Sequence, residues 1–219
     1  METTARMGRY TGVLYALKVV TPNIFYWRFF MNAEEHLKNG KTYLNQNDLD
    51  QAIAEFTEAL RLDPNLAAAK GNLTAAYYNR GVRSFRNGDS DRAIADLTEA
   101  AALTPNDTDI YAARGMIYGK KGNHDGAIND FTEAIRLAPK TISFYHSRAG
   151  HYCDKRNEYL AKGDDIDYFK YLDLAIKDLE DGLKIVPAND VDTELQTNMR
   201  EWLESAKRER KSRKGGLES

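Results

Sequence analysis

A segment that closes with proline recurs four times along the chain and is the strongest pattern in the sequence. The copies read DQAIAEFTEALRLDP (50–64), DRAIADLTEAAALTP (91–105), DGAINDFTEAIRLAP (125–139) and, more loosely, LDLAIKDLEDGLKIVP (172–187). In each copy, small and large apolar residues are spaced three and four apart, so they fall on one face of a helix. Such a face cannot be buried by one helix alone, so the recurrence predicts an all-α chain of stacked helices.

A second, shorter pattern precedes each copy and predicts a partner helix. An aromatic residue is followed by a small one in YYNRG (77–81), YAARG (111–115) and YHSRA (145–149). Before the first copy, the corresponding segment is HLKNG (36–40). Between the two patterns, Gly or Asn can end one helix while Asp, Asn or Ser caps the next. Each unit is therefore expected to be a pair of antiparallel helices.

Together these residues resemble the tetratricopeptide repeat, a unit of about 34 residues that forms two helices. The resemblance covers residues 33–189 and implies an αα superhelix, or solenoid, of four helix pairs. Their expected bounds are 33–66, 67–107, 108–141 and 142–189. The resemblance assigns the packing between helices to Gly40, Ala52, Phe56, Ala59, Gly81, Ala93, Ala100, Gly115, Ala127, Phe131, Ala134, Ala149 and Ala175.

The second and fourth units are longer than the family pattern. The closing prolines, Pro64, Pro105, Pro139 and Pro187, are separated by 41, 34 and 48 residues. An excess of seven residues adds two helical turns and keeps the same face inward. We therefore expect the first helix of unit two to span about 66–87, and both helices of unit four to be about two turns longer than usual.

The C-terminal region predicts one further amphipathic helix at 190–214, which would cap the stack, followed by a tail at 215–219. Asp190 or Asp192 is expected to cap the helix. The residues expected to face inward are Leu195, Met199, Trp202, Leu203 and Ala206. Its basic end, KRERKSRK, could bind nucleic acid, acidic lipid or an acidic partner. We favour a solvated helix end, where positive charge suits the helix dipole.

The N-terminal extension, residues 1–32, is open to two interpretations. Thr21-Pro22 is a helix-start signal, so a helix from Pro22 would place Ile24, Phe25 and Phe29 beside Leu66, Ala69 and Leu73. Alternatively, Met31 begins a natural repeat start, and residues 1–30 form an upstream extension that is cleaved, disordered or not made.

Charge, hydropathy and cysteine content argue against a nucleic-acid-binding, membrane-spanning or disulfide-bonded protein. The formal net charge is −2, and both ends are basic, so the body between them is acidic, which argues against nucleic acid as a partner. The longest apolar stretch is interrupted by Lys18, Pro22 and Arg28, so no membrane span is expected. Cys153 is the only cysteine and excludes an intrachain disulfide. A cytoplasmic protein fits this pattern.

The resemblance implies a non-enzymatic scaffold or adaptor that holds a partner protein's peptide or helix in its concave groove. The expected groove residues are Leu37, Lys41, Tyr78, Val82, Phe85, Arg86, Met116, Lys120 and His146. Tyr78, Phe85 and Met116 would form an apolar strip, or would pack against a neighbouring helix. The clamp that some relatives use for a chaperone's terminal carboxylate is not expected, because only Asn79 matches it. The alternative function is a structural subunit that self-assembles through the extra helical turns.

The sequence predicts no metal, cofactor or catalytic site. His146, His151, Cys153 and Asp154 lie close together in sequence, but His146 and His151 are five residues apart and point about 140° away from each other on a helix. The acidic residues after Gly163 lack the glycine and glutamate of a calcium loop and fit a helix cap better. No grouping typical of acid–base or nucleophilic catalysis stands out.

Overall fold

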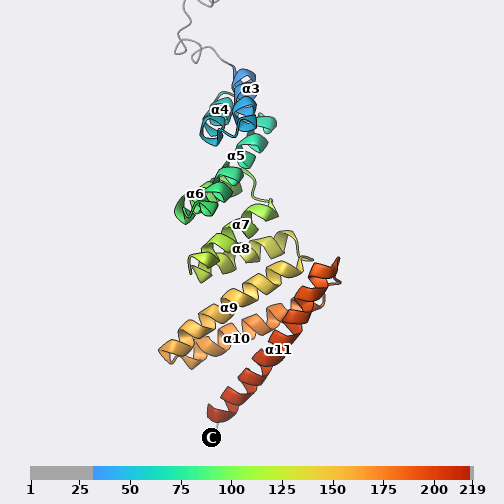
Figure 1. The fold of residues 1–219 in the computed structure, drawn as a ribbon. Coiled ribbons are helices and arrows are strands. Elements are labelled where there is room, and N and C mark those ends of the chain that lie inside the picture. Colours follow the sequence, from blue (N-terminus) through green and yellow to red (C-terminus); the bar gives the residue numbers. More distant parts are fainter. Residues whose placement is uncertain (1–31, 218–219) are drawn as a thin grey trace, which may run out of the picture. The chain divides into compact units, whose positions relative to one another are not determined.

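The computed structural model describes residues 32–217, and all regular structure within this range is helical (Figure 1). The helices are α3 (Ala33–Asn45), α4 (Leu49–Leu62), α5 (Ala67–Arg86), α6 (Ser90–Leu103), α7 (Thr108–Lys120), α8 (His124–Leu137), α9 (Ile142–Lys162), α10 (Asp165–Leu183) and α11 (Asp190–Leu217). None of them is long and apolar enough to cross a membrane. The contacts predicted for Ile24, Phe25 and Phe29 lie outside the described residues.

Contacts divide the described residues into two compact units, which meet between Ala69 and Lys70. The sequence predicts one continuous stack, whereas the division falls in the first turns of α5. These turns belong to the part of the chain that carries the seven extra residues. The two units are therefore described separately.

The first unit contains the α3/α4 pair. Asn32 caps α3 by accepting a hydrogen bond from the backbone N–H of Glu35, and the side chain of Glu35 accepts one from the N–H of Asn32. Gly40 allows the two helices to approach closely, because a Cβ at this position would lie 2.5 Å from the Phe56 ring. Ala52, Phe56 and Ala59 of α4 are fully buried.

The turns inside each helix pair of the second unit repeat one design. Gly88, Gly122 and Gly163 take positive φ angles of 86°, 75° and 71°, a conformation that favours glycine. The residue after each of them caps the next helix with its side chain, and these caps are Asp89, Asn123 and Asp164. The sequence predicted this alternation of a glycine helix end and a polar cap.

Small residues fill the contacts between helices in the second unit. The fully buried alanines are Ala76, Ala93, Ala100, Ala127, Ala134, Ala149 and Ala175. Gly81 and Gly115 are also buried, and a Cβ on either would lie 3.2 Å from side-chain atoms of the paired helix. Phe131 is 2% exposed and packs against Gly115. Side chains this small let helices approach to about 8–10 Å.

The last helix pair is the longest. α9 has 21 residues and α10 has 19, against 13 in α7 and 14 in α8. The added turns are joined by aromatic rings, since Tyr159 stacks on Tyr171 with 5.4 Å between ring centroids and Tyr152 lies 6.2 Å from Tyr171. The ammonium group of Lys155 lies over both Tyr159 and Tyr171, at 5.6 and 5.7 Å. The extra residues therefore form a packed extension of both helices.

α11 lies along both α9 and α10 (Figure 1). Met199 and Leu203 are buried in the core of this region, Leu195 and Trp202 pack at its edge, and Ala206 is buried nearby, as the sequence predicted. Two expectations were wrong. The backbone N–H of Asp192 bonds to the side chain of Asn189, so Asn189 is the capping residue. The helix also continues to Leu217, so residues 215–217 are helical rather than tail.

Candidate functional site

The first helix of each pair supplies the residues predicted to line a groove, and on α5 they form a half-buried strip. Tyr78 and Phe85 pack against a core cluster that α6 and α7 share. Val82, between them, is also half-buried, and Arg86 at the end of the helix is exposed. These apolar side chains therefore have one side against the core and another toward solvent.

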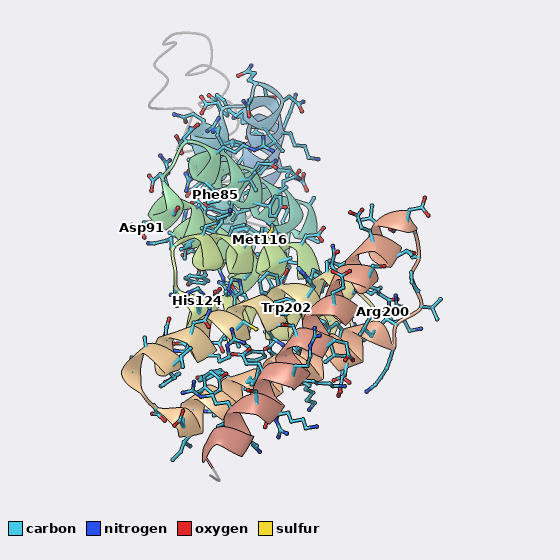
Figure 2. All side chains as sticks on the ribbon, turned by 60° about the horizontal axis from the view of Figure 1, so that its bottom comes forward. Phe85, Asp91, Met116, His124, Arg200 and Trp202 are labelled. Carbon is cyan, nitrogen blue, oxygen red and sulfur yellow. The ribbon has the colours of Figure 1, made fainter. Side chains whose placement is uncertain are left out.

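On α7 the predicted residues are more open. The side chains of Ile110, Ala113 and Ile117 face the core, whereas Met116 is 57% exposed. Lys120, at the end of the same helix, is exposed as well. Figure 2 shows Met116 between Phe85 and Trp202. We call Tyr78, Val82, Phe85 and Met116 the apolar strip.

On α9 the predicted groove is covered by the chain itself. The ring of His146 meets Trp202 of α11 edge-on, with 5.6 Å between centroids, and a Cβ on Gly150 would lie 3.8 Å from the same indole. Burial lowers the pKa of His146 and raises that of the buried Cys153 thiol to about 11. The expectation that His146 lines an open groove was wrong, because α11 packs on α9 as well as on α10.

The first unit holds the two remaining predicted groove residues, and one prediction was wrong. Leu37 is only 5% exposed and belongs to the core. It lies three residues before Gly40, which places it on the face of α3 that meets α4. Lys41 is exposed.

A set of paired charges that the sequence analysis missed joins the helices of the second unit. Each pair is an arginine that donates two hydrogen bonds to an aspartate, at 2.6–2.9 Å: Arg80–Asp96, Arg114–Asp130 and Arg148–Asp178. Arg114 also donates to Thr98, and Arg148 to Thr132, in the preceding helix pair. Bidentate pairs of this kind fix both distance and orientation.

The sequence did contain a signal for this network. Each arginine directly precedes the small residue of the shorter pattern, and each aspartate directly precedes the large apolar residue of the longer one. The first unit departs from the pattern, since Glu55 there lies 2.7 Å from Nδ1 of the buried His36. The network holds the first helices of successive pairs in a fixed orientation, so it positions the apolar strip.

Three side chains with metal-ligand chemistry meet where α8 begins against the middle of α9. They are His124, His151 and Asp154, and one atom of each lies within 4.8 Å of the others. Burial, and next the charge of His124, lower the pKa of His151. The sequence places His151 and Asp154 near His146 and Cys153 on one helix. His124 comes from a neighbouring helix, so spacing within one helix does not identify it.

Helix pairs that stack through small residues and leave a strip of their first helices open define a helical-repeat binding scaffold. The family model of the tetratricopeptide repeat matches residues 33–66 and 74–107, and a second model of the same repeat matches residues 108–141. The chain is a tetratricopeptide-repeat protein of the all-α solenoid class. Such repeats are generally non-enzymatic interaction modules, and this chain is a scaffold for protein–protein interaction.

Solved structures with a similar fold include bacterial and human proteins. The translocator chaperone SycD of Yersinia enterocolitica type III secretion aligns with a TM-score of 0.51 at 18% identity, over 64% of this chain and 88% of its own. SycD in complex with a YopD peptide aligns with a TM-score of 0.49 at 19% identity, over 61% of this chain and 91% of its own. The second repeat domain of human RPAP3, in complex with an HSP70 peptide, aligns with a TM-score of 0.43 at 22% identity, over 57% of this chain and 92% of its own. A search of the curated proteins finds no match.

Proposed function

We propose that this protein is an adaptor that holds a peptide or helix of a partner protein along the apolar strip of α5 and α7. The observation that carries the proposal is the exposure of Met116, which is 57% open to solvent and lies near the half-buried Phe85 of α5 (Figure 2). Methionine and aromatic side chains are enriched at protein interfaces, and methionine adapts to irregular partners. Burying the open half of Met116 would contribute about 1 kcal/mol.

The charges beside the strip favour a partner segment with acidic residues. Arg86 ends α5 and Lys120 ends α7, and both are exposed. They lie at the C-terminal ends of the two helices that carry the strip. An apolar anchor flanked by Asp or Glu would therefore complement both the strip and its edge.

The covering of α9 limits the length of the binding site. Trp202 occupies the face of α9 that carries His146 and Gly150. A partner segment on the second unit would therefore contact α5 and α7 and end near Trp202. Specificity would come from a few anchor side chains rather than from a large contact area.

The test compares partner capture by the wild-type protein with capture by Met116→Glu. Tagged proteins are used as bait in lysate of the source cells, and bound proteins are identified by mass spectrometry. We expect Met116→Glu to lose the partner, because it places a charge in the anchor position of the strip. Since Met116 is largely exposed, circular dichroism should show unchanged helicity and melting.

The matched control is Ile166→Glu, which makes the same kind of change on an apolar side chain that is 84% exposed on α10. This variant should retain the partner. If both variants retain the partner, binding does not depend on the apolar strip and the proposal fails. If both variants lose the partner, the loss is not specific to the strip, and the proposal fails as well.

A second candidate function is self-assembly through the added turns of the last helix pair. Leu160 is 39% exposed near the end of α9, and Ile166 is 84% exposed near the start of α10, so apolar side chains are open at the end of the extension. Sedimentation measurements separate the two functions. A monomer supports the adaptor, whereas an oligomer that Ile166→Glu dissociates supports self-assembly.

A further inference from the structure

The second unit brings two imidazoles and a carboxylate together at the contact between α8 and α9. His124, which is labelled in Figure 2, is the first residue of α8. His151 and Asp154 lie one turn apart on α9. We propose that these three residues form a site for a divalent transition-metal ion, most suitably Zn²⁺. The site is separate from the apolar strip, so it stands independently of the proposed adaptor function.

The distances among the three ligand atoms match a tetrahedral metal site. Nδ1 of His124 lies 3.3 Å from Nδ1 of His151, and Oδ2 of Asp154 lies 3.4 Å from the first nitrogen and 3.6 Å from the second. Zinc binds such atoms at about 2.0–2.1 Å, which in a tetrahedron separates the ligand atoms by about 3.3–3.4 Å. A metal ion could therefore be held with shifts of only a few tenths of an ångström.

The ring of His151 is held in place before any ion arrives. It stacks on Phe131, with 5.8 Å between centroids and 18° between planes. Gly119 lies against the ring, and a Cβ there would come within 2.7 Å of Nε2, so the absence of a side chain makes room for the imidazole. A ligand fixed in this way loses little conformational freedom on binding.

The surroundings suit an ion that keeps one position open. The imidazoles are largely buried, with side-chain exposures of 19% for His124 and 16% for His151, whereas Asp154 is 49% exposed. An ion could enter from the Asp154 side and keep a water as its fourth ligand. Glu158 lies 4.0 Å from Nε2 of His124, where metal-bound histidines commonly have a carboxylate partner.

The choice of metal follows from the ligand types. Two imidazole nitrogens and one carboxylate oxygen suit zinc, cobalt, nickel or copper, whereas magnesium and calcium prefer oxygen alone. The competing explanation is a hydrogen bond between the two imidazoles, with one as donor and the other as acceptor. That explanation predicts no metal affinity, so metal binding separates the two.

The experiment uses the full chain without an affinity tag, freed of metal by dialysis against a chelator. Calorimetric titration with ZnCl₂ should show one ion per chain, with a dissociation constant on the order of 1 µM or lower. Titration with CoCl₂ should produce the visible absorption of tetrahedral cobalt. In NMR spectra, zinc should shift the imidazole signals of His124 and His151 and leave those of His36 and His146 in place.

His124→Gln and Asp154→Asn test the ligands, and His146→Gln is the matched control from α9. We expect each ligand variant to weaken zinc binding by about 100-fold or more, since loss of an outer partner alone costs about 10–100-fold. The control should bind as the wild type does. Asp154→Asn keeps an exposed side chain of the same shape, so it tests the site even if His124→Gln unfolds.

Three results would overturn the site. The first is that the wild-type protein does not bind zinc at a ratio of one to one. The second is that Asp154→Asn binds zinc as tightly as the wild type does. The third is that zinc shifts the signals of His36 or His146 as much as those of His124 and His151. Each of these leaves the hydrogen-bonded pair as the explanation.

Discussion

The α7/α8 pair and the α9/α10 pair use the same contacts at different lengths. Arg114 reaches Asp130 across 16 residues, and Arg148 reaches Asp178 across 30, with nearly identical hydrogen-bond distances. The fourteen additional residues extend α9 and α10 beyond this contact and leave it in place. Lengthening a helix pair therefore does not require a change in the way the pair is joined.

The two pairs differ in what lies on their first helices. On α7, Met116 is open to solvent, whereas on α9 the corresponding face, with His146 and Gly150, lies under Trp202. The repeat pattern fixes how helices pack, but a segment outside the repeats decides which inner face remains available. The apolar strip of α5 and α7 is therefore the surface that we propose as the binding site.

The largest expected effect tests whether the two arginine–aspartate pairs are equivalent. Asp130→Ala and Asp178→Ala each leave a largely buried guanidinium without its partner, since the side chains of Arg114 and Arg148 are both 15% exposed. Removing one partner of a buried ion pair costs about 3–5 kcal/mol. Urea unfolding should show both losses in the free energy of unfolding, equal to within about 1 kcal/mol.

An exposed acidic residue provides the control for these variants. Glu99→Ala on α6 should change the free energy of unfolding by no more than about 0.5 kcal/mol. A clearly smaller loss for Asp178→Ala than for Asp130→Ala would show that the insertion has loosened the last pair, and the equivalence would be wrong.

Most of the helix packing was open to prediction because it depends on local spacing. Alanines and glycines three and four apart identify the buried face of each helix, and a glycine followed by a polar cap identifies the turns. The position of α11 was harder to predict. Its pattern identifies which of its own residues are buried, such as Met199, but not that Trp202 would lie on α9.

The metal-ligand cluster was also hidden from the sequence pattern, because it depends on contacts between helices. His124 and His151 are 27 residues apart on different helices, so spacing within one helix cannot detect them. The repeat itself offered a rule, because Asp125 and Lys155 meet across the same boundary at a separation of 30. Residues near the start of one second helix thus meet residues in the middle of the next first helix.

A second, intermediate effect tests the covering of α9. Trp202→Ala should lower the free energy of unfolding by about 1–3 kcal/mol, because the half-buried indole packs on His146 and Gly150. Met116→Ala, on the open face of α7, should change it by no more than about 0.5 kcal/mol. Both values can be measured by urea unfolding. Equal losses for the two variants would mean that the faces of α7 and α9 do not differ in the way described.

The smallest effect concerns the basic end of α11. Lys207 pairs with Glu180 at 2.8 Å, but both side chains are more than 40% exposed. Lys207→Gln should therefore leave the urea midpoint unchanged within error at physiological salt, because exposed ion pairs contribute little and salt screens them.

Arg156→Gln should lower the midpoint measurably, since Arg156 is 15% exposed and bonds to Glu209 of α11 at 2.8 Å. If Lys207→Gln had the larger effect, surface charge rather than buried contact would hold α11 on the last helix pair, and high salt would then open the face of α9.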